Sequence, residues 1–289
     1  MRVILIPVAD RPECVLALKS AFTLAKRVGA DVIGCHMRPH RDENAPAVME
    51  TGLFSGLGGS DDWPLLPEAE ALKAAVSAKE LFTQIAEQAG FELSANPGTA
   101  DAPVAQWHER VGTPPYVMPV IGPTADMLVV SRPLAKGGRK ARSLLNQALF
   151  SSHRPVLVLP QQEHQFSSKR IAIGWNRGGN ECRTLLAILP MLKAAADVVF
   201  LTAGKYGKHG PTAKDMIRYL SHHGVKARHV NGPNIEGDGK TLEKLVKDEG
   251  ADLLVCGAYS RSKWQEMVFG GVTHYLLNSA DIPVVMMHH

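Results

Sequence analysis

The segment with the clearest chemical content follows an apolar run near the C-terminus. Residues 252–257 (Asp-Leu-Leu-Val-Cys-Gly) have the pattern of a buried strand, and a loop then leads to a helix predicted at 271–280. Gly257 lets a ligand approach the backbone, while Gly270 and Gly271 leave bare amide groups at the helix start. Such a helix start favours phosphate. The alternative is a loop whose glycines serve only turn geometry.

The loop and the helix start add to this predicted phosphate site. Arg261 and Lys263 would add positive charge, and the helix begins near Val272 and Thr273. The loop follows the carboxyl end of a strand, which is where parallel α/β sheets bind ligands. The pattern therefore predicts an anion site at this edge of a sheet.

The chain contains the same strand–helix unit twice. Three segments of the first half have counterparts in the same order in the second: 3–8 and 170–175, 125–131 and 251–257, 155–159 and 283–287. Such a repeat indicates two like domains, predicted at 1–160 and 169–289 and joined by a short polar linker. Alternation of strands and helices predicts mostly parallel sheets covered on both faces.

The predicted elements follow from apolar runs and helical periodicity. In the second half, strands are expected at 170–176, 197–202, 225–230, 252–257 and 283–287, and helices at 180–195, 211–223, 240–249 and 271–280. In the first half, strands are expected at 2–8, 31–36, 103–111, 126–131 and 155–159, and helices at 13–28, 68–89 and 140–152. A long loop rich in Gly, Pro and Asp is expected at 37–67.

Composition bounds the class of protein. The 289 residues are 45% hydrophobic and 21% charged, which is ordinary for a globular chain of two domains. The net charge of +4 is spread along the sequence, which argues against a nucleic-acid binder. The apolar runs are too short to span a membrane. The four cysteines form no CxxC pair, so we interpret them as thiols in a reducing compartment and expect a cytoplasmic location.

At this point the chain resembles the universal stress protein family, in a tandem two-domain form. ATP-binding members of that family carry Gly-x2-Gly-x9-Gly-[Ser/Thr] in this loop. Here the spacing is kept by Gly257, Ser260, Gly270 and Gly271, although Ser260 replaces the second Gly and Gly271 replaces the Ser or Thr. The family's Asp at the end of the first strand is replaced by Asn176, in Gly174-Trp175-Asn176.

The resemblance implies a fold. It implies two tandem doubly wound α/β domains of the adenine-nucleotide alpha-hydrolase-like type, each with a five-stranded parallel sheet in the order 3-2-1-4-5. The two domains would pack as an internal pseudo-dimer, with homodimerisation also open. Pairing of the two Pro-Val strands at their exposed edges would hide their unpaired backbone groups.

The resemblance also implies a function. A cytoplasmic stress-response protein would bind ATP or another adenine nucleotide, with or without Mg²⁺, in the second domain. The nucleoside would lie near Trp175 and Asn176, and nucleotide binding would alter contact with an unknown protein partner. No catalytic residue is assigned, since nothing in the loop is arranged to activate water.

The first copy departs further from this pattern. Ser131-Arg132-Pro133-Leu134 stands where Gly-x2-Gly belongs, and Pro133 has no N–H to donate. Arg142-Ser143 replaces Gly-Ser, and Ala9 takes the place of the Asp unless the register slips by one to Asp10. We therefore predict that the first copy has lost nucleotide binding and serves as a structural partner.

Two other functional classes remain open. One is a nucleotide-free interaction protein that keeps only the fold. The other is a slow ATPase, which would need a water-positioning acid such as Glu266 or Asp281. Residues 234–241 nearly match a P-loop but follow the third strand of their unit, so a helix-entry turn is the preferred interpretation. His222 and His223 lie on different helix faces and do not form a metal pair.

Overall fold

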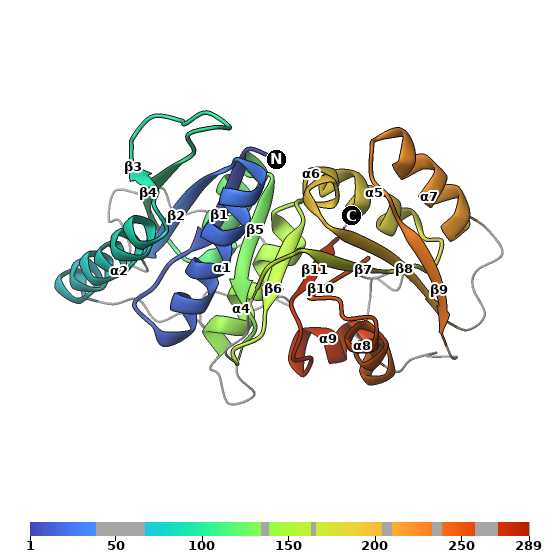
Figure 1. The fold of residues 1–289 in the computed structure, drawn as a ribbon. Helices are drawn as coiled ribbons and strands as arrows, with labels where there is room; N and C mark the ends of the chain where they lie inside the picture. Colours follow the sequence, from blue (N-terminus) through green and yellow to red (C-terminus); the bar gives the residue numbers. More distant parts are fainter. Residues whose placement is uncertain are drawn as a thin grey trace.

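The strands in the described part of the chain join into one continuous sheet flanked by helices (Figure 1). The computed structural model describes residues 1–38, 67–133, 139–162, 166–203, 210–232, 239–257 and 271–288. Strands β1 to β6 form the first half of the sheet and β7 to β11 form the second, so the sequence halves lie side by side (Figure 1).

The elements follow the predicted alternation. The first half comprises β1 (Val3–Pro7), α1 (Pro12–Val28), β2 (Asp31–Arg38), α2 (Glu68–Gln88), β3 (Glu92–Leu93), β4 (Val104–Val111), α3 (Pro114–Ile121), the 3₁₀ turn Gly122–Thr124, β5 (Met127–Ser131), α4 (Arg139–Ser151) and β6 (Val156–Leu159). The second half comprises β7 (Arg170–Gly174), α5 (Gly179–Ala187), α6 (Leu189–Ala194), β8 (Asp197–Ala203), α7 (Ala213–His222), β9 (Arg228–Gly232), α8 (Gly239–Asp248), β10 (Leu253–Gly257), α9 (Gly271–Asn278) and β11 (Val284–Met287).

The strand order confirms the predicted topology. It runs β3-β4-β2-β1-β5-β6-β11-β10-β7-β8-β9, so the main strands of each half have the order 3-2-1-4-5. The first half differs by the two-residue strand β3, which adds to the outer edge of β4. Within each half all pairings are parallel.

The two Pro-Val strands pair with each other, as the edge argument predicts. Strand β11 runs antiparallel to β6, with Val285 opposite Leu157, and it satisfies backbone groups that each edge strand would otherwise expose. The pairing residues on both strands are fully buried. The halves therefore share a hydrophobic core across the junction as well as a hydrogen-bonded sheet.

Local sequence explains where several predicted bounds were wrong. The helix predicted at 180–195 divides at Ile188, because Pro190 lacks an N–H and its ring opposes the preceding turn. The helix predicted from residue 211 begins at Ala213 instead, with Thr212 as N-cap in a capping box with Asp215. Strand β9 begins three residues later than predicted, at Arg228.

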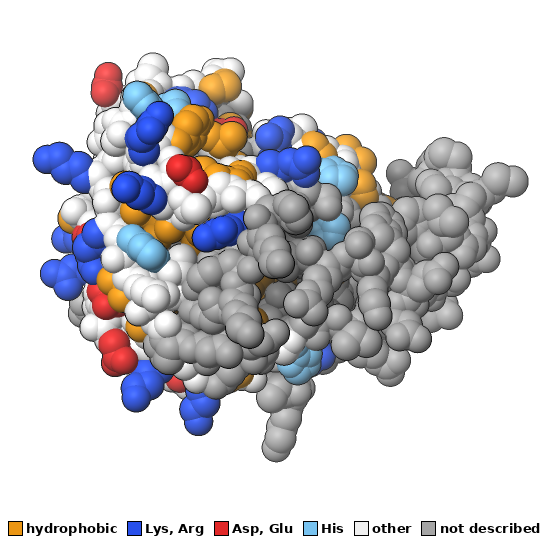
Figure 2. Space-filling model, turned by 90° about the vertical axis from the view of Figure 1, so that its right-hand side faces the viewer, with side chains coloured by type: hydrophobic (Ala, Val, Ile, Leu, Met, Phe, Trp, Pro, Cys, Tyr) orange, Lys and Arg blue, Asp and Glu red, His pale blue; other side chains and the backbone are white. Residues whose placement is uncertain are grey.

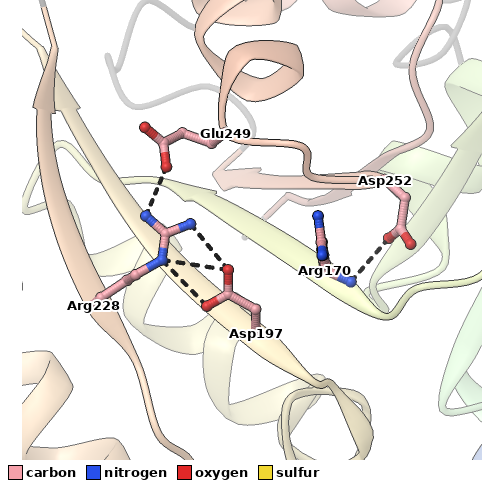
Figure 3. Close-up of polar contacts among 5 residues, drawn as sticks. All are labelled: Arg170, Asp197, Arg228, Glu249 and Asp252. Carbon is pink, nitrogen blue, oxygen red and sulfur yellow. Dashed lines mark hydrogen bonds and ion pairs between the residues drawn. The ribbon is translucent and has the colours of Figure 1, made fainter.

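The repeated Ala-Asp pattern has a structural role in both copies. The carboxylate of Asp126 accepts hydrogen bonds from the backbone amides of Arg2 and Val3, the latter at 3.0 Å. The carboxylate of Asp252 likewise accepts hydrogen bonds from the amides of Lys169 at 3.1 Å and of Arg170 at 3.3 Å, the latter drawn in Figure 3. Each Asp therefore anchors the start of the first strand of its copy.

An ion-pair group lies at the amino ends of the second half's strands. Arg228, at the start of β9, contacts Asp197 at 2.9 Å and Glu249 at 2.6 Å (Figure 3). These side chains are partly exposed, so the pairs contribute little to stability. They lie at the sheet edge opposite to the strands' carboxyl ends, away from the predicted ligand site.

The described part of the face in Figure 2 carries dispersed charge. Lysine and arginine side chains are scattered over the visible described part of the face in Figure 2, without forming one patch. Among the helices that the structure describes, none combines the length and apolar character needed to cross a membrane.

Candidate functional site

The candidate site lies where β7 and β10 end next to each other. These two strands pair in parallel, with Val255 opposite Ile173, so their carboxyl ends meet at one edge of the sheet. Strand β8 flanks β7 on its other side, which makes the β7–β10 junction the topological switch point of this half. The doubly wound fold thus places Gly174, at the end of β7, and Gly257, at the end of β10, at the same edge of the sheet.

The structure describes seven of the ten predicted site residues. They are Gly174, Trp175, Asn176, Gly257, Gly271, Val272 and Thr273; Gly271 opens α9. The other three, Ser260, Arg261 and Gly270, lie outside the described residues, as does Glu266. The predicted phosphate contacts of the loop therefore stay a prediction.

Trp175 is mainly a core residue. Its side chain is 2% exposed, and its ring packs edge-on against Phe200 with centroids 5.6 Å apart. The indole Nε1 donates a hydrogen bond to the backbone carbonyl of Pro211 at 3.1 Å. The ring is thereby fixed between β7 and the entry of α7, and it forms part of a cavity wall.

Asn176 uses its side-chain oxygen locally. Its Oδ1 accepts a hydrogen bond from the backbone amide of Gly178 at 2.8 Å, across the turn that leads into α5. The side chain is exposed at the carboxyl edge of the sheet. The oxygen that the sequence assigned to a nucleoside is therefore already bonded to Gly178 in this structure.

A buried carboxyl group, Glu181, occupies the switch point, and the sequence interpretation missed it. Glu181 lies in the first turn of α5 and is 3% exposed. A Cβ atom added at Gly178 or at Gly257 would collide with its carboxyl group. These glycines therefore leave space for the Glu181 side chain, whether or not they also let a ligand approach the backbone. The available signal was an acidic residue in the first helix turn after Gly178-Gly179.

Burial controls the electrostatics around Glu181. Desolvation raises the pKa of its carboxyl group, against the lowering effects of its own backbone amide and of the Asn176 side chain. Burial also raises the pKa of the neighbouring Cys256 thiol, and the charge of Glu181 adds to that rise. Cys256 is therefore a protonated thiol, consistent with the expected free cysteine.

A cavity of about 210 Å³ opens beside Trp175. It lies where β7, β8 and β9 end and α7 begins, and its lining residues are Trp175, Arg177, Thr202, Thr212, Ala213, Lys214, His229 and Asn231. The Thr202 hydroxyl bonds His229 Nε2 at 2.6 Å and donates to Asn231 Oδ1 at 3.3 Å. The cavity thus combines an apolar wall, a polar wall and two cationic side chains.

Most cavity residues were not predicted, because they come from three strands and a helix that are distant in sequence. The only sequence feature that could have indicated them is their place near strand ends: Thr202 and Asn231 lie near the carboxyl ends of β8 and β9. Arg177 follows β7 with a left-handed backbone conformation of φ 67°. That conformation is uncommon for a non-glycine residue and accompanies the sharp exit of the chain from the strand.

The corresponding loop of the first copy holds the two halves together. Arg132 is 4% exposed and donates hydrogen bonds to three backbone carbonyls of the second half: from Nε to Leu276 at 3.1 Å, from Nη2 to Ile282 at 3.2 Å, and from Nη1 to Ala280. Burial lowers the pKa of Arg132 to about 10, while Glu243, Asp281 and Tyr275 oppose that change. The residue that breaks the Gly-x2-Gly pattern is therefore a docking residue.

Comparisons with known proteins agree with this architecture. Residues 234–288 match the model of the Universal stress protein family. A universal stress protein from Archaeoglobus fulgidus DSM 4304 has a similar structure, with a TM-score of 0.70 and 11% identity over 99% of this chain and 97% of that one. No curated protein sequence matches the chain.

Two further solved structures share the fold. A functionally unknown protein from Pseudomonas aeruginosa PAO1 has a TM-score of 0.57 and 13% identity, covering 99% of this chain and 92% of that one. The cytoplasmic domain of a prokaryotic cation chloride cotransporter has a TM-score of 0.51 and 12% identity, covering 99% and 94%. At these identities the likeness concerns the fold.

The fold defines a tandem, doubly wound α/β protein with a cavity at the carboxyl edge of the sheet in its second half. The match of residues 234–288 to the Universal stress protein family model agrees with the resemblance stated from the loop pattern, and the structural likeness shows that the whole chain has the fold of such proteins.

Proposed function

We propose that this protein acts in stress response by binding an adenine nucleotide in its second half and changing its contact with a protein partner. The match to the Universal stress protein family supports the general role. The observation that carries the ligand proposal is the cavity beside Trp175, at the edge of the sheet where α/β folds take ligands.

The cavity suits one end of a nucleotide. Its volume of about 210 Å³ is below the roughly 300–1,000 Å³ of pockets that enclose drug-sized ligands, so it would accept the base alone. Trp175 and Ala213 offer apolar surface, and Asn231 offers a polar edge. The ribose would then extend over Asn176 towards the β7–β10 junction, and its 5′ end would turn back to the mouth of the cavity, where Arg177 and Lys214 would supply positive charge for one phosphate.

A nucleotide-free interaction protein is the second candidate. The loop after β5 contributes Arg132, whose side chain donates hydrogen bonds to backbone carbonyls of the second half. The cotransporter structure shows that the fold also occurs as the cytoplasmic domain of a transporter. Both observations support a role that depends on protein contact.

An ATPase receives less support. Asp281 lies between α9 and β11, at the amino edge of the sheet, and is 3.8 Å from Lys247. Its backbone amide donates to Glu243 at 3.0 Å. A residue at that edge cannot position water at the carboxyl ends of β7 and β10, so Asp281 is not a candidate for this reaction.

The first test is to denature freshly purified protein and identify the released small molecules by mass spectrometry. We expect AMP, ADP or ATP near one molecule per chain. Titration of ligand-free protein with each nucleotide, with and without Mg²⁺, completes the test. Absence of bound nucleotide together with no heat of binding would favour the interaction-only candidate.

A further inference from the structure

We infer that Glu181 determines which class of adenine ligand the second half accepts: a nucleoside or nucleoside monophosphate in preference to a triphosphate. The inference rests on the proposed function and concerns the part of the site between β7 and β10. It departs from the phosphate contact that the glycine spacing predicts at Gly257, because the structure places a carboxyl group there.

The inference rests first on the position of the Glu181 carboxyl group. Glu181 reaches from the first turn of α5 to the end of β10, so that a Cβ atom at Gly257 would collide with its Oε1, Cδ and Cγ atoms. A Cβ atom at Gly178 would collide with its Oε2 atom. The space that two glycines leave at the switch point is thus already filled by an acidic side chain.

The inference rests second on the hydrogen bonding of the Glu181 carboxyl group. Within the described part of the chain, Oε2 is buried and has no hydrogen-bond partner. A buried polar atom without a partner costs free energy, and a ligand that supplies a donor would recover it. The atom lies beside the Asn176–Gly178 turn, at the β7–β10 junction towards which the proposed ribose extends.

The chemistry of the ligand groups decides which one fits. A ribose hydroxyl donates a hydrogen bond, which Oε2 accepts whether the carboxyl group is protonated or ionised. Phosphate oxygens of an ionised polyphosphate only accept, so they offer no donor to an ionised Glu181 and meet its like charge. A phosphate chain laid against Gly257 is therefore disfavoured, whereas a ribose is favoured.

Within the described residues, the titratable groups that respond to the charge of Glu181 are two thiols. Burial raises the pKa of Cys182 on α5 and of Cys256 on β10, and the charge of Glu181 adds to both rises. A single phosphate still has Arg177 and Lys214 on the cavity side. The positive side chains of Arg177 and Lys214 therefore line the cavity, whereas the carboxyl group of Glu181 lies at the β7–β10 junction.

The experiment compares adenosine, AMP and ATP by isothermal titration calorimetry at pH 7.5. For the wild-type protein we expect adenosine or AMP to bind at least tenfold more tightly than ATP. Glu181→Gln removes the charge at nearly constant volume and should tighten ATP binding at least tenfold. Glu181→Asp keeps the charge and should retain the preference. Glu249→Gln, at the opposite sheet edge, is the matched control and should leave the ratio unchanged.

The outcomes separate the two proposals. Wild-type protein that binds ATP as tightly as AMP overturns the inference without any variant, even if the substituted proteins fail to fold. A Glu181→Gln protein with an unchanged ATP-to-AMP ratio also overturns it, while nucleotide binding itself stands. If none of the three ligands binds the wild-type protein, the proposed function fails and the inference fails with it.

Discussion

The Arg132 Nε atom lies 3.1 Å from the backbone carbonyl oxygen of Leu276, across the junction between the two halves. Leu276 belongs to the last turn of α9, where carbonyl groups lack partners within the helix. The guanidinium group thus caps α9 with a positive charge, which the helix dipole favours. One side chain from the first copy therefore fixes the helix that follows the glycine loop of the second.

Removing this cap should weaken the junction. Arg132→Ala leaves buried carbonyls of the second half unsatisfied, and we expect a loss of about 3–5 kcal/mol in the free energy of unfolding. Urea denaturation followed by circular dichroism measures it. Arg183→Ala, which truncates an exposed arginine on α5, should change stability by less than about 0.5 kcal/mol. Equal effects of the two substitutions would contradict the docking role.

The anchor at Asp126 should give stability that depends on pH. Burial tends to raise the pKa of this carboxyl group, but hydrogen bonds from the amides of Arg2 and Val3 outweigh burial and lower it. A lowered pKa in the folded state stabilises the protein above the ordinary value of 3.8, and that stability is lost as the pH falls below it. Asp126→Asn should cost roughly 1.5–3 kcal/mol at pH 7 and much less at pH 3. A cost that does not vary with pH would contradict this account.

Glu181 should have the opposite pH dependence. Burial raises the pKa of its carboxyl group, so the folded protein holds this proton more tightly than the unfolded chain. The protein therefore loses stability as the pH rises from the ordinary value of 4.5 through the raised value. Glu181→Gln removes the titration, so its stability relative to wild type should increase between pH 4 and pH 8. Thermal unfolding at several pH values tests this, and a constant difference would be contrary evidence.

Gly257 and Glu181 should be energetically coupled. Gly257→Ala places a methyl group against the buried carboxyl group and should cost about 1–3 kcal/mol. In a Glu181→Ala background the same substitution should cost at least about 0.5 kcal/mol less, because the obstructing atoms are gone. A double-mutant cycle from chemical denaturation gives the coupling energy. A coupling of zero would mean that Glu181 moves aside at no cost.

Lys214 should contribute to phosphate binding. It lines the cavity at the start of α7, so Lys214→Glu should weaken AMP binding roughly tenfold, since like charge replaces opposite charge near the phosphate. Adenosine binding should change little. Lys193→Glu, in the last turn of α6 away from the cavity, is the control. If adenosine and AMP weaken equally, Lys214 does not contact the phosphate side of the ligand.

Several features were predictable from sequence because their causes are local. Apolar runs and glycine positions indicated most strands and helices, and the duplicated Ala-Asp and Pro-Val segments indicated two copies of one unit. Edge pairing of the Pro-Val strands followed from the need to cover unpaired backbone groups, and β6 and β11 confirm it. Errors of a few residues arose at Pro190 and Thr212, where proline and capping chemistry set helix bounds.

The sequence by itself determined the repeated α/β plan, its strand order through family resemblance, and the place of Gly174 and Gly257 at one edge of the sheet. Only the tertiary structure decided what fills that edge. Glu181 is one acidic residue among 28 Asp and Glu in the chain, and nothing in its local sequence says that it is buried. Its burial results from packing of α5 against β10 and β11, which come much later in the chain, and such long-range contacts have no local signal.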